Sequence, residues 1–179
     1  MKVVFLDIDG VLNTSKTFER VYNSFKNTGK KELEIDCFRL EYLKKIIEET
    51  NAKIVLSSTW RRFFIKEDNK IIPRNEKGKQ FYYLLNDYNI EIYDILSYES
   101  DLNREGLITN WLSKNEVDSF VIIDDEPNLF NNLLDRLIKT SKVKNNIMLT
   151  NMDDCFGLSE HHIELVEDML RTKVKVKKW

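Results

Sequence analysis

The sequence predicts an α/β fold in which helices cover both faces of a doubly wound, Rossmann-like parallel sheet. Short apolar runs rich in β-branched residues alternate with amphipathic segments along the 179 residues. Most of these runs are apolar on both faces, as expected for strands of a buried parallel sheet joined by helices. In such sheets ligands bind at the carboxyl ends of the strands, so the polar residues after each run indicate the function.

Five apolar runs are predicted to be the strands of this sheet. They cover residues 3–6, 54–56, 90–93, 120–123 and 147–149. Apolar residues at helical spacing, around residues 40–47, 108–112 and 163–170, predict helices between or after them.

Helix-start signals agree with this alternation. Asp36 and Ser159 are expected to cap the helices that follow them, because their side chains accept hydrogen bonds from free backbone amides. Pro127 suits the first turn of a helix, where its missing N–H is not needed.

Two stretches, residues 13–35 and 61–79, do not fit the alternation. The first is expected to hold a short helix over residues 18–22 and to form a small flap or cap, while the second is polar and basic. Both are too short for a separate domain, so we expect residues 1–179 to form a single domain with a small or absent cap.

Composition and charge argue against several classes of protein, although a local basic patch that binds nucleic acid is not excluded. The 28 basic and 30 acidic residues give a net charge of -2, which lacks the overall positive charge of a typical duplex-binding protein. Two cysteines are too few for a disulfide framework and favour the reducing cytoplasm. The first apolar run is too short for a signal peptide, and no run reaches membrane-spanning length, so we expect a cytoplasmic protein without a membrane partner.

The first predicted strand ends in an acidic motif, Asp7-Ile8-Asp9-Gly10. Side chains alternate along a strand, so Asp7 and Asp9 point to the same side, and Gly10 permits a sharp turn close to a ligand. Two carboxylates facing one way repel each other unless a cation or a proton lies between them. Mg²⁺, which prefers oxygen ligands, meets that need.

Other strand ends carry complementary groups. The hydroxyls of Ser57 and Ser58 follow the second strand and suit phosphate oxygens, as does the guanidinium of Arg104 after the third. Asp124 and Asp125 end the fourth strand as a second acidic pair. The strand ends therefore provide carboxylates for a metal together with donors for a phosphoryl group.

This order of motifs, from Val3 to Pro127, resembles the haloacid dehalogenase (HAD) superfamily of phosphohydrolases. The resemblance implies a HAD-like fold, a Mg²⁺ cofactor and a phosphorylated substrate. It also implies a role for each matching residue: Asp7 as nucleophile, Asp9 as general acid and base, Ser57 and Ser58 as phosphate ligands, Arg104 as the neutralising cation, and Asp7, the Asp9 carbonyl, Asp124 and Asp125 around the metal.

The run 54–61, together with residues 5–13 and the pair Trp111-Leu112, resembles more narrowly the HAD domains of Swiss Army Knife RNA repair proteins. This likeness implies a nucleic-acid 3′ or 5′ phosphate as substrate. Residues 61–79 contain seven basic and three acidic residues, and Trp60, Arg61 and Arg62 are candidate substrate-binding residues. The alternatives are that Trp60 packs in the core and that the charges form a solvated surface.

These observations favour a Mg²⁺-dependent phosphomonoester hydrolase with an open site. Asp9 argues against a true dehalogenase, because a halide leaving group needs no proton, and the short insertions argue against a capped phosphomutase. A nucleic-acid end phosphatase and a protein phosphatase stay open as alternatives. A noncatalytic phosphate-binding module is the alternative from another class, against which the full set of motifs argues.

Overall fold

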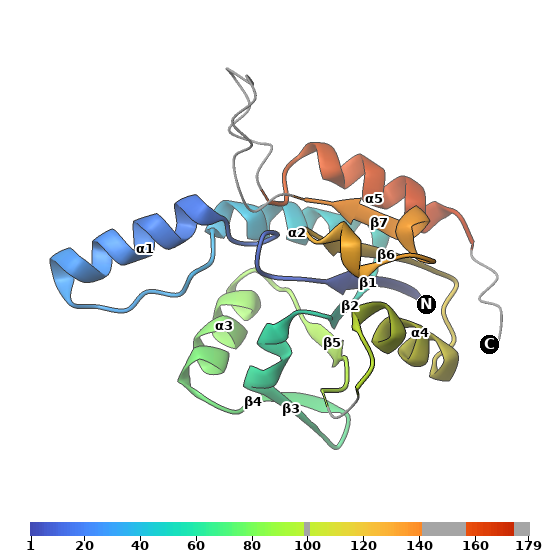
Figure 1. Ribbon diagram of the computed structural model, residues 1–179, viewed down its shortest axis with the longest axis horizontal. Helices are drawn as coiled ribbons and strands as arrows, with labels where there is room; N and C mark the ends of the chain where they lie inside the picture. The colour runs from blue at the N-terminus through green and yellow to red at the C-terminus, as the bar shows by residue number, and fades with distance from the viewer. Residues whose placement is uncertain (99–100, 141–156, 174–179) are drawn as a thin grey trace.

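A computed structural model describes residues 1–98, 101–140 and 157–173 of the chain. In this part of the chain five parallel strands form one sheet in the order β5-β2-β1-β6-β7, and two antiparallel strands form a separate hairpin, β3-β4. Figure 1 shows the sheet between layers of helices. The predicted α/β, doubly wound architecture is confirmed.

The strand β1 lies in the middle of the sheet. It pairs in parallel with β2 on one side and with β6 on the other. The strands that follow β1 in the chain thus lie first on one side of it (β2, β5) and then on the other (β6, β7). The carboxyl end of β1 is therefore the switch point at which ligands bind in this class of fold. The strands of the sheet are β1 (Lys2–Leu6), β2 (Lys53–Leu56), β5 (Ile92–Ile95), β6 (Ser119–Asp124) and β7 (Leu137–Lys139).

The two faces of the sheet are buried by different helices. Val4 and Leu6 of β1 join a core with α2 (Cys37–Thr50), α3 (Glu76–Asp87) and α5 (His161–Arg171). Val3 and Phe5 face the other way and join a second core with α4 (Arg104–Lys114). This alternation along a single strand explains why the run 3–6 is apolar throughout.

The first, second and fourth predicted strands match β1, β2 and β6, but the third is displaced. Residues 90–93 were expected to be extended, whereas β5 spans Ile92–Ile95. Asn89 has a positive φ of 57°, and the Ile90 amide donates to the Leu85 carbonyl at 2.9 Å, so these residues end α3. The predicted strand 147–149 lies outside the described residues, and the edge strand β7 comes from a run that the sequence did not single out.

The helix-start predictions have mixed outcomes. Asp36 is the N-cap of α2, as predicted, although its carboxylate accepts from the Thr17 hydroxyl at 2.6 Å and from Arg39 Nε at 3.3 Å rather than from a backbone amide of the helix. Pro127 begins only a short 3-10 helix, Pro127–Leu129. The predicted cap at Ser159 was one residue early, because α5 has Glu160 as its N-cap and Ser159 bonds instead to the rings of His161 and His162.

Residues 13–35 contain a helix longer than predicted. Instead of a short helix over residues 18–22, α1 spans Ser15–Thr28 and projects from the rest of the molecule in Figure 1. The Thr17 hydroxyl donates to Asp36, just after the segment, and Asn13 Nδ2 donates to the Glu34 carbonyl at 3.1 Å. These contacts tie together the two ends of the segment.

Residues 61–79 are more ordered than their polar composition suggests. They continue a 3-10 helix, η1 (Thr59–Phe63), and form β3 (Phe64–Glu67), β4 (Lys70–Pro73) and the start of α3. Asp68 and Asn69, both with positive φ, make the two-residue turn of the hairpin. Among the described residues, no helix is long and apolar enough to cross a membrane.

Candidate active site

The loop after β1 is held in place by hydrogen bonds from three directions. The Asp7 amide continues the ladder to β6 by donating to the Ile123 carbonyl at 3.0 Å. Gly10 has a φ of 81°, and its amide donates to the Asn13 side chain at 3.0 Å. The Thr140 hydroxyl donates to the Gly10 carbonyl at 2.8 Å. The loop is therefore fixed before any ligand arrives.

Three carboxylates meet at this loop. One oxygen from each of Asp7, Asp124 and Asp125 lies within 4.8 Å of the others. Asp7 and Asp124 are buried, and Asp125 is partly buried. We call these three residues the acidic trio. It offers three carboxylate oxygens from the ends of adjacent strands, which is the donor chemistry that Mg²⁺ prefers.

Arg104 is a cation that contacts two members of the trio. It stands at the start of α4, and its Nη1 forms an ion pair with Asp124 and lies 3.4 Å from the nearer Asp7 oxygen. A guanidinium here compensates part of the buried negative charge and leaves other N–H groups of its planar fork for a bound anion.

The environment of Asp7 disfavours its charged form. Burial raises the pKa of Asp7 to about 7, and the Asp124 carboxylate adds to this rise, against the opposing effects of Arg104 and of a hydrogen bond from Ser58. Burial also raises the pKa of Asp124. A bound cation would offset both the desolvation cost of these buried carboxylates and the repulsion between them. The electrostatics as well as the ligand atoms therefore fit a divalent metal.

The end of β2 supplies polar donors beside the trio. The Ser57 and Ser58 amides both donate to the Leu6 carbonyl, at 2.9 and 3.3 Å, which places the two serines against β1. Arg61 donates from Nη1 to the Ser57 and Ser58 carbonyls at 3.0 and 2.9 Å. Within the described residues, Ser57 Oγ and Arg61 Nε are the buried side-chain polar atoms without a hydrogen-bond partner. Such atoms are costly to bury unless a ligand satisfies them.

Asp9 lies apart from the acidic trio. Its carboxylate accepts from Trp60 Nε1 at 3.2 Å to each oxygen and from Asn13 Nδ2 at 2.9 Å to Oδ1. The structure thus gives the two carboxylates of the Asp7-Ile8-Asp9 motif different surroundings. Asp7 belongs to an acidic and cationic cluster, whereas Asp9 is held by neutral N–H donors.

The three candidate substrate-binding residues have different environments. Trp60 is only 4% exposed and packs edge-on against Phe63 and Phe81, which favours the packing alternative over base stacking. Arg61 is half-buried, and burial together with the nearby Arg104 and Arg62 lowers its pKa, so three cations lie close together. Arg62 is exposed.

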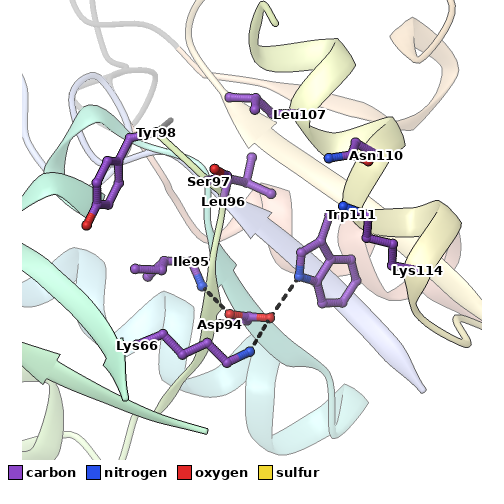
Figure 2. A pocket seen from close by; sticks show the side chains of 10 residues that line it. All are labelled: Lys66, Asp94, Ile95, Leu96, Ser97, Tyr98, Leu107, Asn110, Trp111 and Lys114. Carbon is purple, nitrogen blue, oxygen red and sulfur yellow. Dashed lines mark hydrogen bonds and ion pairs between the residues drawn. The ribbon is translucent and has the colours of Figure 1, made fainter. Parts of the chain in front are cut away.

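Two hollows of the described part of the chain have no member of the acidic trio among their lining residues. A groove of about 670 Å³ lies between α1 and the start of α3, and Phe18, Tyr22, Glu34 and Lys77 are among its lining residues. A pocket of about 370 Å³ lies on the other side, beyond β5 (Figure 2). There both oxygens of the buried Asp94 carboxylate have hydrogen-bond partners, since it accepts from Trp111, Lys66 and the Ile95 amide, each at 2.9 Å. The ion pair between Lys66 of β3 and Asp94 of β5 thus links the hairpin to the sheet.

Three residues support the site without having been singled out by the sequence. Asn13 bridges Gly10 and Asp9, and Thr140 binds the Gly10 carbonyl from 130 positions away. Glu105 is buried and accepts from the amides of residues 131–133, which follow the second acidic pair. An asparagine three residues after a glycine turn is a recognisable signal, but the other two contacts depend on the folded chain.

A doubly wound sheet with an Asp-x-Asp motif after its first strand, a second acidic pair and a cation on the next helix defines a phosphatase-type hydrolase of the HAD superfamily. The model of the family described as "HAD domain in Swiss Army Knife RNA repair proteins" matches residues 3–145, and the chain belongs to this family. HAD proteins generally use Mg²⁺ and act on phosphorylated substrates, consistent with the acidic trio. A search of curated proteins and one of solved structures found no match.

Proposed function

We propose that the protein is a Mg²⁺-dependent phosphomonoester hydrolase that works through an aspartyl-phosphate on Asp7. The observation that carries the proposal is the acidic trio, with Arg104 against it and unsatisfied donors of Ser57 and Arg61 beside it. A site that combines carboxylates for a metal with free donors for an anion suits a metal-bound phosphoryl group.

The first half-reaction transfers the phosphoryl group to the protein. An Asp7 oxygen attacks phosphorus, the bond from phosphorus to the ester oxygen breaks, and the leaving oxygen takes a proton from Asp9. Ser57, Arg61 and Arg104 donate hydrogen bonds to the phosphoryl oxygens, whose charge they partly neutralise. Nucleophilic catalysis of this kind divides one difficult displacement into two easier steps.

The second half-reaction restores the protein. Asp9, now ionised, takes a proton from a water molecule, whose oxygen attacks phosphorus and breaks its bond to Asp7. Inorganic phosphate leaves, and Asp9 again carries a proton. Asp7, Asp124, Asp125 and the Asp9 carbonyl would hold the metal, which would supply positive charge toward the phosphoryl oxygens.

The direct test is Mg²⁺-dependent release of phosphate from an aryl phosphate. We expect turnover with Mg²⁺, none after chelation, and recovery when Mg²⁺ is returned. Borohydride reduction during turnover should convert the acyl phosphate at Asp7 to homoserine, detectable by peptide mass. Equal turnover with and without a divalent cation would contradict the metal assignment.

Metal binding should also change the pH dependence of stability. In metal-free protein Asp7 keeps its proton to about pH 7, whereas in the unfolded chain it loses it near 3.8. The folded state therefore binds more protons between these values, and stability falls as pH rises. From pH 4.5 to 7.5 we expect Asp7 to lower the free energy of unfolding by about 3 kcal/mol.

Urea titrations of wild type and Asp7→Asn, with and without Mg²⁺, measure this effect. His162, whose pKa burial lowers to about 4, contributes in the opposite direction. It titrates in both proteins, so their difference isolates Asp7. Mg²⁺ at pH 7.5 should restore the stability of wild type but affect Asp7→Asn much less. A difference that stays constant between pH 4.5 and 7.5 would show that Asp7 is already ionised in the folded, metal-free protein.

A nucleic-acid end is the substrate that two observations favour. The description of the family names RNA repair proteins, and Arg61 and Arg62, which follow the carboxyl end of β2, add positive charge near Arg104. An exposed cation such as Arg62 can bind a flanking phosphate and make affinity depend on salt. A phosphorylated protein side chain would also reach an open site, but no described residue specifically favours it.

A substrate panel with an Arg62→Ala variant tests this assignment. We expect end-phosphorylated oligonucleotides to exceed phosphopeptides and small phosphates in kcat/KM. Arg62→Ala should raise KM for oligonucleotides several-fold, with a shallower salt dependence, and leave small phosphates unaffected. Arg171→Ala, which removes an exposed arginine of α5, is the control. Preference for phosphopeptides would instead support a protein phosphatase.

A further inference from the structure

The carboxylate of Asp9 receives a donor from outside the Asp7-Ile8-Asp9-Gly10 motif. Trp60 follows β2 in the chain, 51 positions after Asp9, and its indole Nε1 lies 3.2 Å from both Asp9 oxygens. Asn13 donates to one of the same oxygens at 2.9 Å. Two neutral donors from different parts of the chain therefore set the orientation of this side chain.

The indole itself has little freedom to move. Trp60 is 4% exposed, its amide donates to Ser58 Oγ at 3.3 Å, and its ring packs edge-on against Phe63 and Phe81 with centroid distances of 5.7 and 5.2 Å. A side chain locked by packing can hold a catalytic group within the narrow range of geometries that proton transfer requires.

A lysine connects this indole to the segment that contains α1. Lys77 Nζ lies 4.2 Å from the centre of the Trp60 ring and 2.5 Å from Glu34. The Glu34 carbonyl in turn accepts from Asn13, the second donor to Asp9. Trp60, Lys77, Glu34 and Asn13 thus form a continuous ring of contacts that closes on Asp9.

We propose that Trp60 is the positioning residue of the general acid and base, holding the Asp9 carboxylate away from the acidic trio and toward the ester oxygen. The proposal rests on the proposed function of Asp9. An indole N–H can donate to either oxygen, so the contact persists whether or not Asp9 carries a proton. Without the indole N–H, Asp9 keeps the Asn13 donor but is held less firmly in its orientation, and protonation of the leaving group slows.

The test uses the chemistry of the leaving group. An alkyl phosphate needs a proton on its departing oxygen, whereas an aryl phosphate with an acidic phenol needs it much less. We expect Trp60→Phe to lower kcat/KM for the alkyl phosphate about 10- to 100-fold, and for the activated aryl phosphate less than about threefold, since general acid catalysis contributes about 10² to 10⁴-fold. The apparent Mg²⁺ affinity should not change.

The chain offers a closely matched control in Trp111. This residue is 7% exposed, and its Nε1 also donates to a buried carboxylate, that of Asp94, at 2.9 Å (Figure 2). Trp111→Phe therefore removes the same kind of hydrogen bond outside the site. We expect it to lower stability without changing the ratio of alkyl to aryl kcat/KM. Losses of the same size for both substrates in Trp60→Phe would overturn the proposal.

Two further variants separate this proposal from the assignment of Asp9. Asp9→Asn should show the same leaving-group dependence as Trp60→Phe, but larger, and adding Trp60→Phe to it should have no further effect on the ratio. An equal loss for both substrates in Asp9→Asn would refute the role of Asp9 itself. If Trp60→Phe does not fold, 3-benzothienylalanine at position 60, which replaces N–H by sulfur in a ring of similar shape, must give the predicted change in the ratio.

Discussion

Asp7→Asn is expected to lower phosphatase turnover by about 10⁴-fold or more, the largest effect predicted here. An amide cannot form the acyl phosphate, and loss of a nucleophile that acts with its partners as a unit typically removes most of the catalysis. The change keeps the size of the side chain and removes charge from a crowded acidic site, so the variant should fold at least as well as wild type. Steady-state kinetics on an aryl phosphate, with stability measured in parallel, provide the readout.

Asp94→Asn is the matched control for this variant. Asp94 is another buried aspartate, and it lies at β5, outside the acidic trio, where it accepts from the Trp111 indole N–H. We expect it to retain turnover within a few-fold while losing some stability, because its ion pair with Lys66 is removed. Turnover by Asp7→Asn close to that of wild type would exclude the aspartyl-phosphate mechanism.

Gly10→Ala is expected to weaken Mg²⁺ binding by about tenfold or more and to lower the free energy of unfolding by about 1–3 kcal/mol. Gly10 has a φ of 81°, which disfavours any residue with a Cβ. An added Cβ would also lie 2.7 Å from the Cβ of Asp125, so this member of the acidic trio must move. Calorimetric titration with Mg²⁺ and urea unfolding measure the two effects.

Gly29→Ala separates backbone strain from displacement of the site. Gly29 also has a positive φ, of 70°, but nothing lies within 4 Å of a Cβ placed there. We expect this variant to lose stability and to bind Mg²⁺ as wild type does. Equal Mg²⁺ affinities for the two alanine variants would mean that Asp125 does not contribute to the metal site.

Most of the sheet could be predicted from the sequence because its central strands are buried on both faces. Residues 3–6, 54–56 and 120–123 have no polar interruption, so their pattern suits a parallel sheet better than a surface strand. The edge strand β5 is less clear, because its apolar run continues from the buried end of α3. Ile90 is apolar because it is buried in the turn that ends α3. Residue type alone does not distinguish this role from that of a strand residue.

The hairpin shows where composition misleads. Residues 61–79 are mostly charged, yet Phe64 is fully buried and Ile71 nearly so, and both join the core beneath the β2 end. The two-residue turn at Asp68 and Asn69 was the available signal, since these residue types tolerate a positive φ. The many charged residues around this turn hide the alternation of buried and exposed residues that is typical of a hairpin with one exposed face.

The residues of the proposed site could be located from strand ends, but their connections could not. Position after a strand is enough to bring Asp7, Asp124 and Asp125 together, because adjacent parallel strands end at one edge. The contact between Trp60 and Asp9, by contrast, depends on how η1 leaves β2, and that between Thr140 and Gly10 depends on the path after β7. Such contacts depend on tertiary packing rather than on local pattern.

Because β1 is the central strand, changes in chain length have different consequences at its end and in the segments outside the sheet. The Asp7 loop is held by strands on both sides, so insertions or deletions there would disturb the whole sheet. The segment with α1 and the β3–β4 hairpin lie outside the sheet, where length and composition can vary without moving a strand. Relatives with the same residues at the strand ends are therefore free to differ in these two parts of the chain.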